Sequence, residues 1–384
     1  MSEPGDDIYG SPEHRAFRET VRRFVQTELV PRAREFDHLG RIDKSLYRKM
    51  GDLGLLGICY DPRYGGQGLD YSYQAVFLEE LGLCDNAGVA MGITVQTDMA
   101  TPALHRFGSE ELKRKYLVPA LRGEQVGAIA VTEPGAGSDV AGIRTRAVRH
   151  SEEWVINGSK MYITNAATAD WLCLLAVTDP DGGYGGFSQI IVPTDVPGFS
   201  YQLLDKIGNK GSDTGLLFFE DVRVPVANTI GDLSRGFQQQ MMQFQNERMV
   251  PVVMAPVVSR QLWEITLKHA QERVLFGTPL AKMQVTQHKF VDMLIQITAA
   301  QEFAHRCIRK MVREEDATLD ISMAKVFCTA VQQYVATTCL QLFGGAGYCW
   351  ENPAARAFVD SRLAAIGAGA DEVMKQVVAK ILGI

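Results

Sequence analysis

The sequence lacks the features that would direct a chain to a nucleic acid or into a membrane. It carries 39 Lys and Arg against 45 Asp and Glu, a formal net charge of -6, and no basic run is left unbalanced by acids. No stretch approaches the roughly 20 uninterrupted apolar residues of a membrane helix, because the densest one, Met249 to Val258, contains Pro251 and Pro256. We therefore expect neither a nucleic-acid partner nor a membrane span.

The sequence also has little that would form disulfides or a metal site. Its seven cysteines are scattered from Cys59 to Cys349 without a C-x-x-C pair, and its seven histidines do not cluster with them. Free thiols and no bound metal are therefore expected. Residues 1–7 are acidic, unlike a secretory signal or an Arg-rich transit peptide, so we predict a cytoplasmic protein.

Hydrophobic periodicity divides the 384 residues into three segments. Apolar residues recur at intervals of three and four over 11–122, which predicts packed helices, the first of them ending at Pro31. Short β-type runs separated by Asn-Gly, Asp-Gly-Gly and Pro-Gly turns fill 126–224, and helical periodicity returns at Phe237. We predict an N-terminal helical domain over 1–125, a central β-domain over 126–236 and a C-terminal helical domain over 237–384.

A glycine-rich loop, Val131-Thr-Glu-Pro-Gly-Ala-Gly-Ser-Asp139, follows an apolar run. Its exposed backbone N–H groups and hydroxyls are suited to polar ligand atoms. Alone it is weak evidence, because most such turns only connect strands and its spacing matches neither the P-loop nor the dinucleotide fingerprint. The motifs that give it context are Asn157-Gly-Ser-Lys160, Tyr162-Ile-Thr-Asn165, Phe219-Glu-Asp-Val-Arg-Val-Pro225, Glu272-Arg-Val-Leu-Phe-Gly277 and Gln341-Leu-Phe-Gly-Gly-Ala-Gly-Tyr348.

In this order and with these gaps, the motifs resemble the acyl-CoA dehydrogenase family over essentially the whole chain. The resemblance implies an α+β fold with a C-terminal four-helix bundle, assembled as a homotetramer with one FAD per subunit. A Thr hydroxyl and backbone N–H groups suit a flavin ring that gains negative charge on accepting hydride. The family often has Trp where Tyr162 stands, a change that keeps an aromatic wall. The residues implied to line the ring are Val131, Thr132, Ser138, Tyr162 and Thr164.

A second group of matching residues is implied to contact the FAD of a neighbouring subunit. Arg273 and Phe276 match the positions that hold its pyrophosphate and adenine side, and a guanidinium fork suits a diphosphate. Without the resemblance, Arg273 would be interpreted as a solvated helix charge beside Glu272. The other cofactor positions carried over are Gln284, Gln341, Gly344, Gly345, Ala370 and Glu372.

The catalytic base is not where many family members have it. They place a Glu in a C-terminal Tyr-Glu-Gly-Thr stretch, but this chain has Gly367 and Ala368 in place of that Tyr and Glu. Long-chain, isovaleryl and citronellyl-CoA dehydrogenases instead place a Glu directly before an Arg on the first long helix of the C-terminal domain. This chain has Gln245-Asn-Glu-Arg248 there. Glu247, on the shoulder of an apolar helix stripe, is therefore the predicted base.

The resemblance implies FAD-dependent oxidation of an acyl-CoA thioester to its trans-2-enoyl-CoA. A thioester α-proton is poorly acidic, so Glu247 needs a pKa raised by burial, while the Ala368 N–H and a ribityl hydroxyl of FAD stabilise the carbonyl. The β-hydrogen leaves as hydride to flavin N5, and an electron-transfer flavoprotein is the expected acceptor. Small residues at 367–370 favour a long or branched acyl chain. The predicted substrate contacts are Ser138, Gln245, Asn246, Arg248, Ala368 and Gly369.

Three alternatives stay open on these residues. An acyl-CoA oxidase would pass its electrons to O₂, a choice set by solvent access to the flavin. Flavin-dependent hydroxylases share the fold but need no α-proton base, so Glu247 argues against them. A non-catalytic family member would follow from the loss of a base at Ala368 if Glu247 were an ordinary solvated helix residue.

Overall fold

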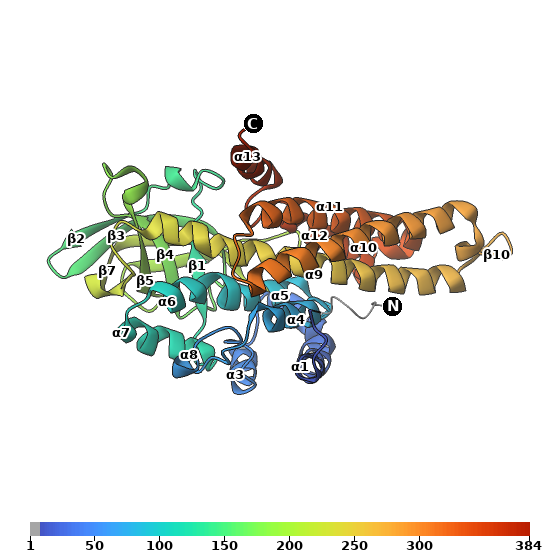
Figure 1. The fold of residues 1–384 in the computed structure, drawn as a ribbon, viewed down its shortest axis with the longest axis horizontal. Coiled ribbons are helices and arrows are strands. Elements are labelled where there is room, and N and C mark those ends of the chain that lie inside the picture. Colours follow the sequence, from blue (N-terminus) through green and yellow to red (C-terminus); the bar gives the residue numbers. More distant parts are fainter. Residues whose placement is uncertain (1–7) are drawn as a thin grey trace.

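The computed structural model describes residues 8–384. Helices at both ends of the chain enclose a central β-sheet, which confirms the predicted α+β fold. In Figure 1 the sheet lies at the left, the N-terminal helices lie below, and the C-terminal helices extend to the right. Within the described residues no helix is long and apolar enough to cross a bilayer. Residues 1–7, which contributed to the prediction of a cytoplasmic protein, lie outside the described part.

Side-chain caps begin several of the N-terminal helices. Asp43, Asp70 and Asn86 each accept a hydrogen bond from a backbone N–H of the first turn that follows. Pro31 does not end the helical segment as predicted. Helix α1 already ends at Phe24, and a π-helical turn and a 3-10 turn that contains Pro31, where its missing N–H is tolerated, lead into α2, which ends at Leu39. The elements are α1 (Pro12–Phe24), η1 (Val25–Leu29), η2 (Val30–Arg32), α2 (Ala33–Leu39), α3 (Lys44–Asp52), η3 (Pro62–Tyr64), α4 (Tyr71–Gly82), α5 (Ala87–Thr94), η4 (Val95–Ala100), α6 (Thr101–Phe107), α7 (Glu110–Leu112), η5 (Lys113–Leu117) and α8 (Val118–Leu121).

Helix α4 is buried along most of its length and carries two buried carboxylates, Glu79 and Glu80. Arg18 of α1 donates to both, at 2.7 and 2.9 Å, and Arg22 donates to Glu80 at 2.7 Å. Removing one partner of a buried ion pair leaves an uncompensated charge and is strongly destabilising. These pairs therefore fix α4 against α1 and hold steady the face that α4 turns towards α9.

The described residues form one eight-stranded sheet in the order β6-β7-β3-β2-β4-β5-β8, with β1 parallel to β4. Strands β4 and β5 are buried almost throughout, as expected for strands covered on both faces. Two register shifts interrupt the pairing of β3 with β7, one of them between Lys160 and Ile163. The elements are β1 (Gly127–Ala130), η6 (Val140–Gly142), β2 (Arg146–His150), β3 (Glu153–Thr164), β4 (Trp171–Val177), η7 (Gly183–Gly185), β5 (Phe187–Pro193), β6 (Phe199–Leu203), β7 (Thr214–Pro225), η8 (Val226–Asn228) and β8 (Thr229–Ile230).

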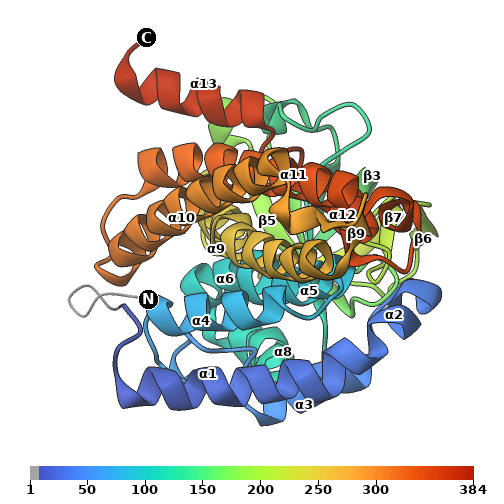
Figure 2. The same cartoon turned by 90° about the vertical axis from the view of Figure 1, so that its right-hand side faces the viewer.

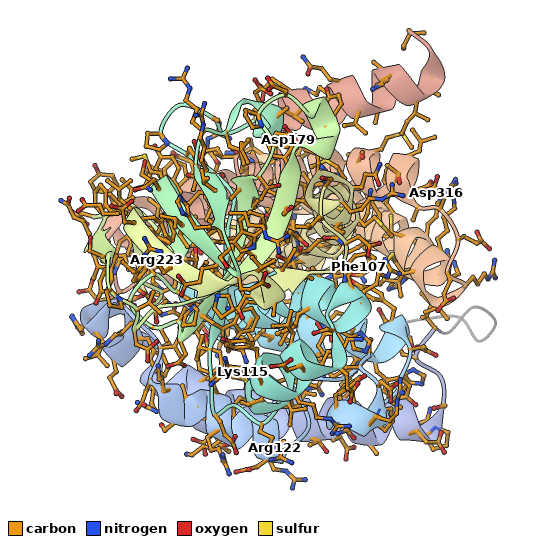
Figure 3. The ribbon with its side chains drawn as sticks, turned by 90° about the vertical axis from the view of Figure 1, so that its left-hand side faces the viewer. Phe107, Lys115, Arg122, Asp179, Arg223 and Asp316 are labelled. Atoms are coloured by element: carbon orange, nitrogen blue, oxygen red, sulfur yellow. The ribbon has the colours of Figure 1, made fainter. Side chains whose placement is uncertain are left out.

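Several charged side chains lie on the outside of this half of the molecule. Figure 3 shows exposed Arg223 on the β-domain, and exposed Lys115 and Arg122 on the helices below it. The apolar side chains of β4 and β5 are directed inward instead, where they join the buried core. The sheet is therefore a packed support for the loops at its edge.

Helix α9 has 37 residues and connects the β-domain to the far end of the C-terminal bundle (Figure 1). Pro251 and Pro256 lie inside it without ending it, although each removes a backbone hydrogen bond. Figure 2 shows α9, α10 and α11 above the N-terminal helices, with α13 projecting beyond them. The elements are α9 (Gly236–Glu272), β9 (Val274–Leu275), β10 (Thr278–Pro279), η9 (Leu280–Lys282), α10 (Gln284–Val312), α11 (Thr318–Phe343), η10 (Gly344–Tyr348), α12 (Pro353–Ala364) and α13 (Asp371–Leu382).

Candidate active site

Successive side chains near the start of α9 have different partners. Gln245 donates to Thr318 Oγ1 of α11 at 3.2 Å, and Arg248 Nε donates to the carbonyl of Ala368 at 3.4 Å. Asn246 lines a cavity against α4 and η4. Because successive residues of an α-helix are turned by about 100°, Glu247 points between the direction of Asn246 and that of Arg248. Glu247 therefore lies between this cavity and the segment that contains Ala368.

Phe244, one turn before Arg248, connects α9 to the glycine-rich loop. It packs on the apolar cluster that contains Val131 and Phe187, and the guanidinium carbon of Arg248 lies 5.7 Å from the centre of the Phe244 ring. Three segments that are far apart in sequence thus meet here: the loop after β1, the start of α9 and the turn between α12 and α13. The structure brings the predicted base and the predicted flavin loop into one region.

The surroundings of Glu247 favour its protonated form. Part of the side chain remains accessible to solvent, but protein surrounds the carboxyl group, and this burial raises its pKa to about 7. The positive charges of Arg248 and Lys325 act in the opposite direction and lower the pKa. A carboxyl group that titrates near neutrality can both accept and release a proton at working pH.

The segment 366–370 lies against Lys325, whose side chain is fully buried on α11. Lys325 Nζ donates to the carbonyl of Gly369 at 2.8 Å. Ala368 and Gly369 have positive φ angles of 54° and 90°, and a Cβ at Gly369 would approach the Met374 side chain to 2.5 Å. The backbone N–H of Ala368 has no hydrogen-bond partner among the described residues. The turn therefore presents one free donor close to α9.

A buried lysine of β3 holds loop 131–138 in place. Lys160 Nζ donates to the carbonyl of Val131 at 2.8 Å and to Glu133 Oε1 at 3.0 Å. Burial lowers the pKa of Lys160 to about 8, and the charge of Glu133 opposes this shift. Glu133 also accepts two backbone N–H groups of the following segment, at 2.6 and 2.8 Å. The hydrogen bonds that hold the loop are thus made on the side of the loop that faces the protein interior.

The outer side of the same region presents hydroxyl and aromatic groups. The side-chain hydroxyls of Thr132 and Ser138 make no hydrogen bond within residues 8–384, and Thr164 ends β3 nearby. Tyr162 is 63% exposed and has a φ of 62° at the register shift of β3. Such a backbone angle is uncommon for a bulky residue and is typical of functional sites. An exposed ring beside unused donors fits the edge and face of a flavin.

The residues predicted to touch a neighbour's FAD lie at the other end of α9. Arg273 follows Glu247 by 26 residues, a rise of about 39 Å in an α-helix. Phe276 is completely exposed at the β9–β10 hairpin, and the rings of His269 and Phe343 stack at 4.5 Å to join α9 to the end of α11. The exposed residues of this end that the sequence singled out are Arg273, Phe276, Gln284, Gln341, Gly344 and Gly345.

Within one chain, these residues and loop 131–138 are therefore not brought together. In Figure 1 the β9–β10 hairpin lies at the right-hand end and the sheet at the left. Ala370 directly follows Gly369 in the segment that lies against Lys325, and Glu372 is exposed in the first turn of α13. A single copy of the chain thus contains two separate groups of cofactor candidates.

The buried ionisable residues that sequence reasoning missed include Lys160, Lys325 and Asp98. Asp98 accepts hydrogen bonds from Gln74 and Thr97, and burial raises its pKa to about 7. Each had a signal in the sequence, a charge among apolar neighbours at the period of its element. Such a residue is rarely buried without a specific partner.

Three family models match the chain one after another. They are described as the N-terminal domain (residues 11–124), the middle domain (128–222) and the C-terminal domain (234–383) of acyl-CoA dehydrogenase. The chain belongs to the acyl-CoA dehydrogenase family. Its members are FAD-binding flavoproteins, so the predicted enzyme type and cofactor are confirmed. The family also identifies it as an oxidoreductase of fatty acid metabolism.

Named relatives match over nearly the whole chain. The mitochondrial long-chain specific acyl-CoA dehydrogenase of Sus scrofa is 37% identical over 373 residues, which are 96% of this chain and 86% of the relative. The probable acyl-CoA dehydrogenase YngJ of Bacillus subtilis is 34% identical, over 96% of this chain and 98% of the relative. The solved butyryl-CoA dehydrogenase of Megasphaera elsdenii superposes with a TM-score of 0.92 at 33% identity, over 100% of both chains.

Proposed function

We propose that this enzyme oxidises a long-chain or branched acyl-CoA thioester to the trans-2-enoyl-CoA, with Glu247 as the base that removes the α-proton. One observation carries the assignment of the base: the Glu247 carboxyl is surrounded by protein and has a pKa raised to about 7, at the meeting point of α9, loop 131–138 and the segment 366–370. Long-chain and branched substrates agree with the small residues of that segment. The long-chain specific relative from Sus scrofa points the same way.

The residues of the chain have complementary parts in this reaction. The Glu247 carboxylate takes the α-proton, and Arg248 and Lys325 favour its ionised form before the substrate reacts. The free N–H of Ala368 donates to the thioester oxygen and stabilises the enolate character that develops there. Bound FAD supplies the acceptor that takes the β-hydrogen as hydride. Ser138, Gln245, Asn246 and Gly369 are the remaining substrate contacts that we propose.

The geometry fits a flavin held by loop 131–138 and the end of β3. Lys160 engages the carbonyl of Val131, so the loop turns hydroxyls and N–H groups outward. Thr132, Ser138 and Thr164 would hold the polar edge of the ring, and the exposed Tyr162 would cover one face of it. A donor-rich edge is what a ring that gains negative charge requires.

We further propose that the complete FAD site needs a second copy of the chain, within a homotetramer. Arg273 and Phe276 lie about 39 Å of helix away from Glu247, too far to act on the same flavin ring, and Phe276 is wholly exposed. Aromatic residues and arginine are both enriched at protein interfaces. The neighbour's Gln284 and glycine turn after α11 would complete the site.

An electron-transfer flavoprotein is the electron acceptor that we propose, in a reducing compartment such as the cytoplasm. The curated relatives are named as dehydrogenases, which favours such a carrier over O₂. All seven cysteines are free thiols, five of them buried, as expected where disulfides do not form. Slow reoxidation of the reduced enzyme in air would separate this function from that of an oxidase.

The test is Glu247→Gln, a nearly isosteric change that removes the base. We expect FAD and acyl-CoA to bind as before, while bleaching of the flavin by acyl-CoA under anaerobic conditions slows by about 10²–10⁴-fold. The matched control is Glu264→Gln, which removes an exposed carboxylate from the same helix and should bleach at the wild-type rate. Bleaching of Glu247→Gln at that rate would show that another group is the base.

A further inference from the structure

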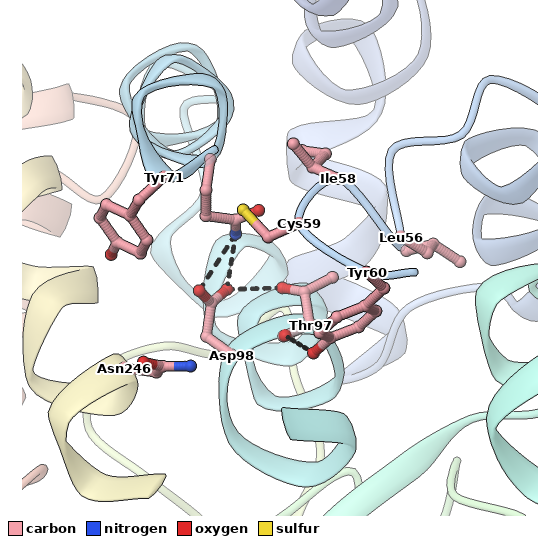
Figure 4. Close-up of a pocket in the computed structure, with 9 residues that line it drawn as sticks. Leu56, Ile58, Cys59, Tyr60, Tyr71, Thr97, Asp98 and Asn246 are labelled. Atoms are coloured by element: carbon pink, nitrogen blue, oxygen red, sulfur yellow. Dashed lines mark hydrogen bonds between the residues drawn. The ribbon is translucent and has the colours of Figure 1, made fainter. Parts of the chain in front are cut away.

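A second feature of α9 is the cavity next to its catalytic segment. It has a volume of about 40 Å³ and lies where α9 faces α4, η4 and the chain before η3 (Figure 4). Asn246 forms its wall on the α9 side, directly before Glu247 in the helix. Since a water needs about 10–15 Å³ of such space, the cavity has room for a group of a few heavy atoms.

One wall of the cavity is a closed hydrogen-bond network around a buried acid. Gln74 Nε2 donates to both carboxylate oxygens of Asp98, at 3.0 and 3.1 Å, and Thr97 Oγ1 donates at 2.6 Å. Tyr60 in turn donates to the backbone carbonyl of Thr97 at 2.8 Å. Asp98 is only 3% exposed, and its surroundings raise its pKa to about 7. The network therefore holds the Asp98 carboxyl in place beside the cavity.

Two further polar groups of the cavity are not used by the protein. The hydroxyl of Tyr71 is buried and has no hydrogen-bond partner among the described residues. The side-chain amide of Asn246, which is partly exposed, also makes no hydrogen bond within residues 8–384. Figure 4 shows both groups around the space beside Asp98. A buried polar group without a partner is costly, and nearly all such groups in proteins find one. The Tyr71 hydroxyl is therefore the observation that points to a ligand, and the free Asn246 amide lines the same cavity.

We propose that this cavity is a subsite for a hydroxyl group carried on the acyl chain of the substrate. The inference rests on the proposed function and adds the chemical class of the chain. A hydroxyl both donates and accepts, so it can pair with Tyr71 and with Asn246 or Asp98 at once. None of the nine lining residues has a basic side chain, and a carboxylate on the chain would meet Asp98 without a counter-charge.

A purely alkyl chain is disfavoured for the opposite reason. Its methylene groups would displace solvent from Tyr71, Asn246 and Asp98 without offering a partner to any of them. Sites built from buried polar groups reject analogues that lack the matching group more strongly than apolar pockets reject an added one. The position of Asn246 beside Glu247 places this discrimination next to the reacting carbons.

The experiment compares dodecanoyl-CoA with a series of hydroxydodecanoyl-CoA isomers, whose hydroxyl moves from the fourth carbon to the last, on the FAD-loaded enzyme. We measure Kd by equilibrium dialysis and kcat/KM by anaerobic flavin bleaching. At least one isomer should bind about tenfold more tightly than dodecanoyl-CoA and show a higher kcat/KM by a similar factor. If no isomer is preferred in either measurement, the inference is overturned, whether or not any variant can be made.

The variant is Tyr71→Phe, which removes the unused hydroxyl and keeps the ring. It should bind the preferred isomer less well and dodecanoyl-CoA better, so that the tenfold ratio falls towards one. Tyr116→Phe is the matched control, because the Tyr116 hydroxyl is also buried without a partner among residues 8–384 but does not line the cavity. It should keep the wild-type ratio. A ratio that survives in Tyr71→Phe would overturn the inference.

The two measurements separate this inference from the proposed function. Equal use of alkyl and hydroxyalkyl substrates, with rapid bleaching by both, would leave the dehydrogenase function standing and overturn the hydroxyl subsite. Tighter binding of one hydroxy isomer without any bleaching would support the subsite and overturn the proposed dehydrogenation.

Discussion

The raised pKa of Glu247 gives this enzyme a pH dependence that an ordinary carboxylate would not give. With a pKa of about 7 instead of 4.5, the ionised fraction of the base falls about tenfold for each pH unit below 7. An ordinary glutamate would stay ionised from pH 5.5 upward. We therefore expect the rate of flavin bleaching by acyl-CoA to rise about tenfold between pH 5 and pH 6, and to level off above 7.

The same shift predicts a change in stability, which provides a second readout. Because the folded state holds the Glu247 proton more tightly than the unfolded state, stability from this group is present below about pH 4.5 and is lost as the pH rises through 7. A shift of this size corresponds to at most about 3 kcal/mol. Glu247→Gln cannot ionise, so its free energy of unfolding should decline less than that of the wild type between pH 5 and pH 8.

The pH profile is measured by stopped-flow absorbance under anaerobic conditions, and stability by urea unfolding of the FAD-loaded enzyme. Lys325→Met removes one of the two charges that lower the pKa of Glu247. The pH range over which the bleaching rate rises should therefore move to higher pH. Lys49→Met is the control, since it removes an ion pair with Glu28 in the N-terminal helices. It should leave the pH dependence of the bleaching rate unchanged. A bleaching rate that is flat between pH 5 and pH 8 would refute the assignment.

Two further predictions concern the loop and the far end of α9. Lys160→Met leaves Glu133 buried without its cation and should lower the free energy of unfolding by about 3–5 kcal/mol. Lys44→Met, at an exposed ion pair, should lower it by under about 1 kcal/mol. Equal losses in urea unfolding would contradict the role of Lys160 as a buried partner of Glu133. Phe276→Asp should reduce both the mass of the assembly measured by light scattering and its FAD content. Val148→Asp, at an exposed apolar residue of β2, should reduce neither. If Phe276→Asp keeps its assembly and its FAD, Phe276 does not contact a neighbouring subunit.

Much of the fold was predictable because its signals are local. The change from helical periodicity to short strands with Gly turns, and back again, depends on neighbours in sequence, and the structure has its helices and strands in that order. The meeting of Glu247 with loop 131–138 was predictable only through the family resemblance. No spacing in one chain states that Phe244 packs on the cluster of Val131.

The remainder depends on tertiary burial, which the sequence does not print. The sequence marks Lys160 and Lys325 only as charges among apolar neighbours, and their burial follows when the sheet and the bundle close over them. The positive φ of Tyr162 arises from a register shift between two strands, and that shift depends on both partners. Pro31 failed as a helix end because a change of helix type accommodated it. For the two lysines and Tyr162 the deciding partner is distant in sequence, whereas the change that accommodates Pro31 is local.

Because α9 is uninterrupted, its length sets the distance between the proposed base and the proposed contact to a neighbour's FAD. Glu247 lies on this helix and Arg273 directly follows its last residue, so the number of residues between them sets both the separation and the relative direction of the base and the arginine. Deleting one residue would shorten the span by about 1.5 Å but swing one end by about 100° around the axis. Deleting seven would nearly restore the direction and remove about 10 Å of length. Insertions and deletions along this stretch would therefore change a geometry that single substitutions leave in place.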